Sequence, residues 1–173
     1  MRYSRQDCCA LAAIDDERFK TMVRRQQIPV PHSPRRSGSA RRSDAAFSEI
    51  DILVVAVGEA IRASVGQDRG LPADSAMRLA LAAREYIERA FKQRMAGGDL
   101  WAGIVVGRVF LSSRSFGFKT AWYVGGSLSD VMTQIEREQG VSGEPVRVFA
   151  VNISAVIREV IERADHAGIP FAA

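Results

Sequence analysis

The stretch "WAGIVVGRVFLSSRSFGFKTAWYVGG", residues 101–126, decides the fold because it predicts two strands joined by a short turn. Residues 101–111 carry β-branched and aromatic side chains at both odd and even positions, which is typical of a strand covered on both faces. "SSRS" supplies the turn, and the returning segment alternates in polarity, so it is expected to be half exposed. Its predicted core face holds Phe116, Phe118, Trp122 and Val124, and its other face holds Lys119, Ala121 and Tyr123.

The segments before this hairpin predict two helices. Ser48 and Asp51 form a capping-box pattern, and apolar residues then recur at helical spacing to about Ser64. A second helix is expected from Pro72 to the glycine pair at residues 97–98, since the intervening residues are strong helix formers.

The segments after the hairpin predict a helix, a strand and a final helix. The first helix is capped by Ser127 or Ser129 and ends at Gly140, the strand covers 145–151, and the last helix ends near Gly168. Because a strand-helix-strand connection is nearly always parallel, strand 101–111 is best placed in the centre, antiparallel to both neighbours. The expected fold is α+β (α/β), with element order α-α-β-β-α-β-α and a small mixed three-stranded sheet packed with about four helices.

The charge of the chain is divided unevenly. Residues 1–46 hold ten Lys or Arg against five Asp or Glu, whereas residues 47–173 hold fourteen against fifteen. Residues 29–44, "PVPHSPRRSGSARRSD", offer almost nothing to bury. We therefore predict a disordered basic tail over 1–46, with a weak amphipathic helix over 15–27, and a single globular domain over 47–173.

The basic residues and the aromatic hairpin admit a nucleic-acid interpretation. Paired arginines neutralise phosphates, and aromatic rings beside cations stack on bases. The competing interpretation, a solvated linker and a core hairpin, is favoured because the aromatic residues share one strand face. The nucleic-acid candidates are Arg24, Arg25, Arg35, Arg36, Arg41, Arg42, Arg108, Arg114 and Lys119.

Cysteine content and hydropathy bear on the compartment. The two cysteines, Cys8 and Cys9, are neighbours that cannot join distant parts of the chain, so we interpret them as incidental reduced thiols. The apolar runs are shorter than the roughly 18–20 residues that span a bilayer. We expect a cytoplasmic protein without a membrane partner.

The inventory of chemical groups is poor for an enzyme. Residues 47–173 hold one histidine, His166, and no cysteine, so neither a Cys-His pair nor a His/Cys metal site can be built there. His166 is expected to cap the end of the last helix. No phosphate-loop, dinucleotide or nucleophile-elbow motif is present. The sequence predicts no catalytic, metal-binding or cofactor-binding residue and favours a protein that is not an enzyme.

One ligand site is predicted from the topology. The loops at 97–101, 125–129 and 152–154 should meet at one edge of the sheet, where helix N-termini attract anions. The same residues also serve as ordinary helix caps, so both interpretations stay open. The candidates are Asp99, Gly125, Gly126, Ser127, Ser129, Asn152 and Ser154.

Three function classes follow. The favoured one is a small regulatory or adaptor domain that acts through protein contacts or through self-association as a homodimer. The second is a protein that binds nucleic acid weakly and without sequence preference through its tail. The third is a phosphate-binding or small-ligand-binding domain, which would admit an enzyme, at the predicted crevice.

Overall fold

Strand β1 (Leu100–Val109) forms the centre of a three-stranded sheet, between β2 (Phe118–Ser127) and β3 (Glu144–Asn152). Both pairings are antiparallel, and Val105 of β1 lies opposite Trp122 on one side and opposite Val148 on the other. The outer strands run parallel to each other without pairing, as the connection between them requires. The predicted strand order and the α+β class are confirmed.

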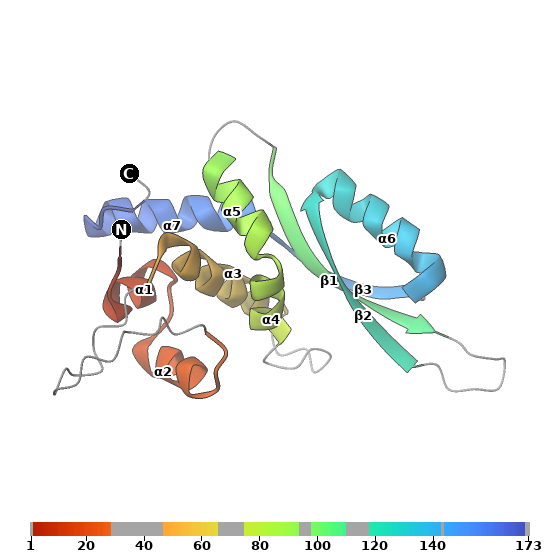
Figure 1. Cartoon of the computed structure of the whole chain (residues 1–173), viewed down its shortest axis with the longest axis horizontal. Coiled ribbons are helices and arrows are strands. Elements are labelled where there is room, and N and C mark those ends of the chain that lie inside the picture. Colours follow the sequence, from red (N-terminus) through yellow and green to blue (C-terminus); the bar gives the residue numbers. More distant parts are fainter. Residues whose placement is uncertain are drawn as a thin grey trace.

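The structure, a computed structural model, describes residues 2–28, 47–65, 75–93, 98–109, 118–142 and 144–171 (Figure 1). Its helices are α1 (Arg5–Leu11), α2 (Asp16–Arg24), α3 (Glu49–Val65), α4 (Ser75–Ala82), α5 (Arg84–Gln93), α6 (Leu128–Ser142) and α7 (Ile153–Ala167).

Helices cover the sheet on both faces, with α6 on one side and α3, α4, α5 and α7 on the other (Figure 1). Because side chains alternate along a strand, Val105 faces α6 and packs with Val131. Ala102 and Ile104 face the opposite way and belong to the larger core. The prediction that residues 101–111 are covered on both faces is confirmed for residues 101–106, whose burial the structure describes, and stays a prediction for the others.

The second strand of the hairpin shows the predicted difference between its two faces at Trp122 and Tyr123. Trp122 packs against the cluster beneath α6, which confirms the core interpretation for this residue. Tyr123, its neighbour, points to the other face and is 51% exposed. Phe118 begins β2, while Phe116 lies outside the described residues.

Helices α3 and α6 begin with the same pair of reciprocal hydrogen bonds. The Ser48 N–H donates to the Asp51 carboxylate at 3.1 Å, and the Asp51 N–H donates to the Ser48 hydroxyl at 3.2 Å. Ser127 and Asp130 repeat this arrangement at α6. The predicted capping box is confirmed, and Ser127 rather than Ser129 caps α6, which begins at Leu128.

The helix expected over 72–96 is divided at Ala83 into α4 and α5. The break is local, because the Ala83 N–H still donates to the Leu79 carbonyl and the Ile87 N–H to the Ala83 carbonyl. Leu79, Ala83 and Ile87 are all buried, so the bend keeps one continuous apolar side against the core.

The prediction of a disordered tail over 1–46 is wrong for residues 2–28. This segment forms α1 and α2, and its apolar side chains are buried in the main core with those of α3 and α7. The predicted amphipathic helix exists as α2, and Asp15 caps it by accepting from the Arg18 N–H at 2.7 Å. The segment was misjudged because its few apolar residues are separated by many charged ones. The buried residues are Tyr3, Cys8, Leu11, Ala12, Ile14, Phe19, Met22 and Ile28.

Long-range contacts hold this N-terminal segment in place. Tyr3 exchanges backbone hydrogen bonds with Phe47, and Arg18 donates two hydrogen bonds to the buried Glu59 carboxylate of α3. Cys8 is part of the core rather than an incidental thiol in a tail, and burial raises its pKa well above the ordinary value. Residues 29–46 lie outside the described residues.

We expect Phe19→Ala to lower the free energy of unfolding by about 3–5 kcal/mol, because truncating a buried aromatic leaves a cavity. The ring is fully buried and lies edge-on to Phe47, with 5.5 Å between the ring centroids. Urea unfolding measures the change. Arg24→Ala, at an exposed position of the same helix, should change stability by less than about 0.5 kcal/mol. Equal stabilities for the two variants would restore the tail interpretation.

Candidate functional site

A cavity of about 190 Å³ lies between the α4–α5 bend and the edge strand β2. An apolar cavity of roughly 150 Å³ is large enough to hold benzene, so this one has room for a single apolar side chain. Its lining is mostly apolar or aromatic, with one amide group. The lining residues are Leu79, Ala82, Ala83, Tyr86, Tyr123, Val124, Gly125 and Gln134.

The backbone of β2 presents hydrogen-bonding groups along this cavity. The Gly125 N–H donates to Gln134 Oε1 at 3.1 Å, and Gln134 Nε2 donates to the Gly125 carbonyl at 2.6 Å. Gln134 belongs to α6, so these Gly125 groups point away from β1, the neighbouring strand. In an antiparallel strand the direction of the backbone groups alternates, so those of Tyr123 also point outward. The cavity therefore adjoins an edge with donors and acceptors.

The ring of Tyr86 explains why position 125 is a glycine. A Cβ atom on Gly125 would lie 2.5 Å from Cε2 of Tyr86, which is closer than carbon atoms can approach. Gly126 has a φ of +131°, a conformation open to glycine, and a Cβ there would lie 2.9 Å from Asp130. A side chain at either glycine would therefore meet Tyr86 or Asp130 of the same chain, at the place where we predicted the close approach of a ligand.

The three loops predicted to converge do meet at one end of the sheet, where β1 begins and β2 and β3 finish. Leu100 lies opposite Ser127, and Trp101 lies opposite both Gly126 and Asn152. However, α6 and α7 leave this end of the sheet on opposite faces, so the two helices run away from each other (Figure 1).

Asp99 occupies the start of α7. Asn152 Nδ2 donates to its carboxylate at 2.6 Å and Arg158 Nη1 at 2.9 Å, and these two bonds hold the pKa of Asp99 below its ordinary value. Ser154, the next predicted residue, accepts from the Leu100 N–H at 3.0 Å. An anion that used the Asn152 amide or the Arg158 guanidinium here would therefore have to displace a carboxylate.

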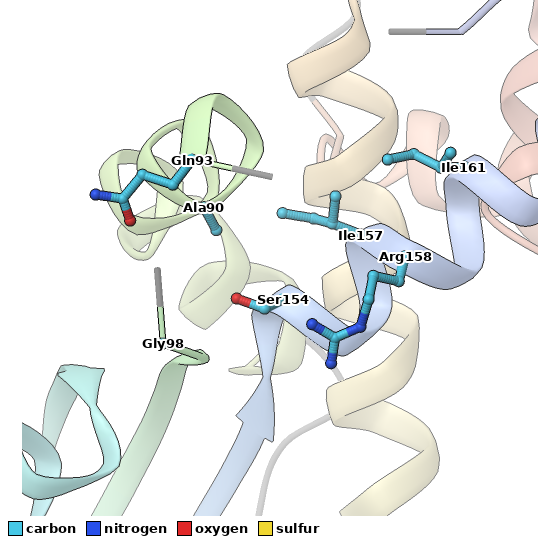
Figure 2. A pocket seen from close by; sticks show the side chains of 7 residues that line it. All are labelled: Ala90, Gln93, Gly98, Ser154, Ile157, Arg158 and Ile161. Carbon is cyan, nitrogen blue, oxygen red and sulfur yellow. The ribbon is translucent and has the colours of Figure 1, made fainter. Parts of the chain in front are cut away.

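Arg158 of α7 bonds a residue outside its own helix, a contact that no sequence pattern indicated. Its guanidinium lies 2.9 Å from the Asp99 carboxylate, whereas its neighbour Glu159 pairs within α7 with Arg163, also at 2.9 Å. Beside Arg158 is a cavity of about 30 Å³, the room of roughly one water molecule. Figure 2 shows Ser154 of α7 facing α5 across this space. Its lining residues are Ala90, Gln93, Gly98, Ser154, Ile157, Arg158 and Ile161.

The start of α6 is occupied in the same way. The Ser127 N–H and hydroxyl donate to the Asp130 carboxylate at 2.9 and 2.8 Å, which lowers the pKa of Asp130. The Ser129 carbonyl accepts from the Thr133 hydroxyl, and its side chain is exposed. A ligand at this crevice stays a prediction.

The nucleic-acid candidates are scattered over the described residues. Arg24 and Arg25 are exposed at the end of α2, and Arg108 of β1 lies opposite Lys119 of β2. The remaining candidates lie outside the described residues, so their role stays a prediction. These are Arg35, Arg36, Arg41, Arg42 and Arg114.

Groups for metal chemistry are sparse. Among the described residues, no cluster of three or more His, Cys, Asp or Glu side chains is placed to hold a metal ion. His166 is exposed in the last turn of α7, with Nδ1 2.8 Å from the Glu162 carbonyl oxygen, as the capping interpretation expects. In the same part of the chain, no helix has the length and apolar character needed to cross a membrane.

No protein-family model matches the chain, and no curated protein has significant sequence similarity to it.

We expect Gly125→Ala to destabilise the protein by about 1–3 kcal/mol, because the new methyl group must displace the Tyr86 ring. Gly98→Ala is the matched control, since a Cβ atom there meets nothing within 4 Å. Thermal unfolding compares the two variants. Adding Tyr86→Ala should recover part of the loss at residue 125, and a lack of recovery would contradict the assigned contact.

Asp99 should make part of the stability acid-sensitive. Its pKa is lowered in the folded protein, so its contribution is present at neutral pH and is lost as the pH falls through that lowered value. Melting temperatures between about pH 6 and pH 2 should fall less for Asp99→Asn than for the wild type. Asp165→Asn, at an exposed carboxylate of α7, is the control. Parallel curves for all three proteins would contradict the prediction.

Proposed function

We propose that this chain is a non-enzymatic regulatory or adaptor domain that binds an extended segment of a partner protein. The segment would add as a strand along the outer edge of β2 and place one apolar side chain in the adjoining cavity. Such strand addition gains affinity from main-chain hydrogen bonds and specificity from side-chain pockets.

The observation that carries the proposal is the position of Tyr123. Its outward-facing backbone groups adjoin the cavity of about 190 Å³. In an antiparallel pair, directly opposite residues point to the same face of the sheet. A partner residue opposite Tyr123 would therefore direct its side chain toward the α4–α5 side, where Leu79 and Ala82 line the cavity. We call this partner residue the anchor.

The other edge of the sheet is less suited to strand addition. In β3, Pro145 lacks an N–H, and the register against β1 shifts between Val106 and Gly107. Prolines and bulges are features that discourage pairing at a sheet edge. The pairing of β2 with β1 is regular from Leu100 opposite Ser127 to Val109 opposite Phe118. These differences favour β2 as the edge that accepts a strand.

A synthetic peptide tests the proposal. The anchor peptide is acetylated and amidated Thr-Thr-Leu-Thr-Thr, which is extended and has one apolar side chain. We expect its titration into ¹⁵N-labelled protein to shift the amide signals of Tyr123 and Ala82. Ala82→Arg, which fills the cavity mouth from a helical position, should weaken binding by at least about tenfold. Ala167→Arg, at an exposed helical position of α7, is the matched control.

The absence of shifts at Tyr123 and Ala82 at millimolar peptide would overturn the proposal. Sedimentation of the protein alone tests self-association in the same samples. A dimer that Ala82→Arg dissociates and Ala167→Arg preserves would mean that a second copy occupies the edge in place of a partner protein.

A further inference from the structure

The side chain of Gln134 makes the two hydrogen bonds that a neighbouring strand would make with Gly125. Its carbonyl oxygen accepts from the Gly125 N–H, and its amide donates to the Gly125 carbonyl. A carboxamide has the same donor and acceptor as a peptide group. One residue of α6 thus takes the place of one residue of an added strand.

We infer that Gln134 determines where a docked strand ends on β2, and so limits which partner residues contribute to binding. The inference rests on the proposed function, because it assigns a specificity-determining residue to the same edge. Gly125 is occupied, whereas the outward groups of Tyr123, two residues away, are the next along the edge. A docked segment pairs at Tyr123 and can form no main-chain bond at Gly125.

The consequence concerns residues beside the anchor. With the anchor opposite Tyr123, partner residues beyond it toward Gly125 leave the sheet and contribute no backbone bonds. Residues on the other side of the anchor continue along β2 toward Phe118. Selectivity therefore lies in the anchor and in the residues on one side of it.

Removal of the Gln134 amide should lengthen the usable edge. Gln134→Ala frees both Gly125 groups, and Gln134→Asn shortens the side chain by one carbon while it keeps a polar group on α6. Amide hydrogen exchange of Gly125 should be slow in the wild type and faster in both variants. Thr133→Ala, at the exposed neighbouring position of the same helix, is the control and should leave the exchange of Gly125 unchanged.

Extended versions of the anchor peptide provide the functional test. Two further threonines are added at either its N-terminus or its C-terminus, and affinities are measured by the same titration. For the extension that runs toward Gly125, we expect no gain in affinity for the wild type and Thr133→Ala. A gain of about tenfold is expected for both Gln134 variants, since two hydrogen bonds become available.

The outcomes separate the two proposals. If the anchor peptide binds but its extensions behave alike in the wild type and the Gln134 variants, the role of Gln134 is wrong and the proposed function stands. If the anchor peptide does not bind the wild type, the proposed function fails, and the inference about Gln134 fails with it. Unchanged exchange of Gly125 in both Gln134 variants would also overturn the inference.

Discussion

Coverage of β1 on both faces is the constraint on which the remaining structure depends. A central strand with apolar side chains at both odd and even positions needs a helix layer on each face and a pairing strand at each edge. One layer is α6, which covers Val105, and the other is built from α3, α4, α5 and α7. Because the sheet has three strands within the part of the chain that the structure describes, both neighbours of β1 are edge strands there. The edges are therefore where this fold has backbone groups to offer.

The sheet could be predicted from local patterns, whereas the N-terminal segment could not. The apolar side chains at both odd and even positions of residues 101–111 indicate a central strand. The strand-helix-strand connection from β2 to β3, which is nearly always parallel, then leaves few topologies. Helices α1 and α2 depend instead on distant partners, such as Phe19 against Phe47 and Arg18 against Glu59. Their apolar residues are too sparse to indicate a core before those partners are known. The composition was also considered over residues 1–46 together, which grouped the helical residues 2–28 with residues 29–44, a stretch rich in Pro, Ser and Arg.

The candidate site shows the same division. Sequence reasoning brought the loops around Asp99, Gly126 and Asn152 to one edge, because strand directions determine where loops lie. It could not assign Arg158 to Asp99 or Tyr86 to Gly125, because these contacts depend on how α7 and α5 cross the sheet. Gly125 was singled out for its lack of a side chain, and that reason holds. The group that approaches it closely is an aromatic ring of the same chain.

The carboxylates of Asp99 and Asp130 give the starts of α7 and α6 partners from the same chain, whereas the edge strands carry outward-facing backbone groups. Open strand edges promote unwanted pairing, and proteins commonly block them with bulges, prolines or charged side chains. In β3, Pro145 and a register shift do so along the backbone itself, and neither can be reversed by a side-chain rotation. Among the described contacts of β2, the group that occupies the outer edge is a rotatable amide, that of Gln134, over a regular strand. An edge that is closed at Gly125 by a rotatable side chain and adjoins an apolar cavity at Tyr123 is suited to controlled pairing, which is the physical basis for the proposed binding role at β2.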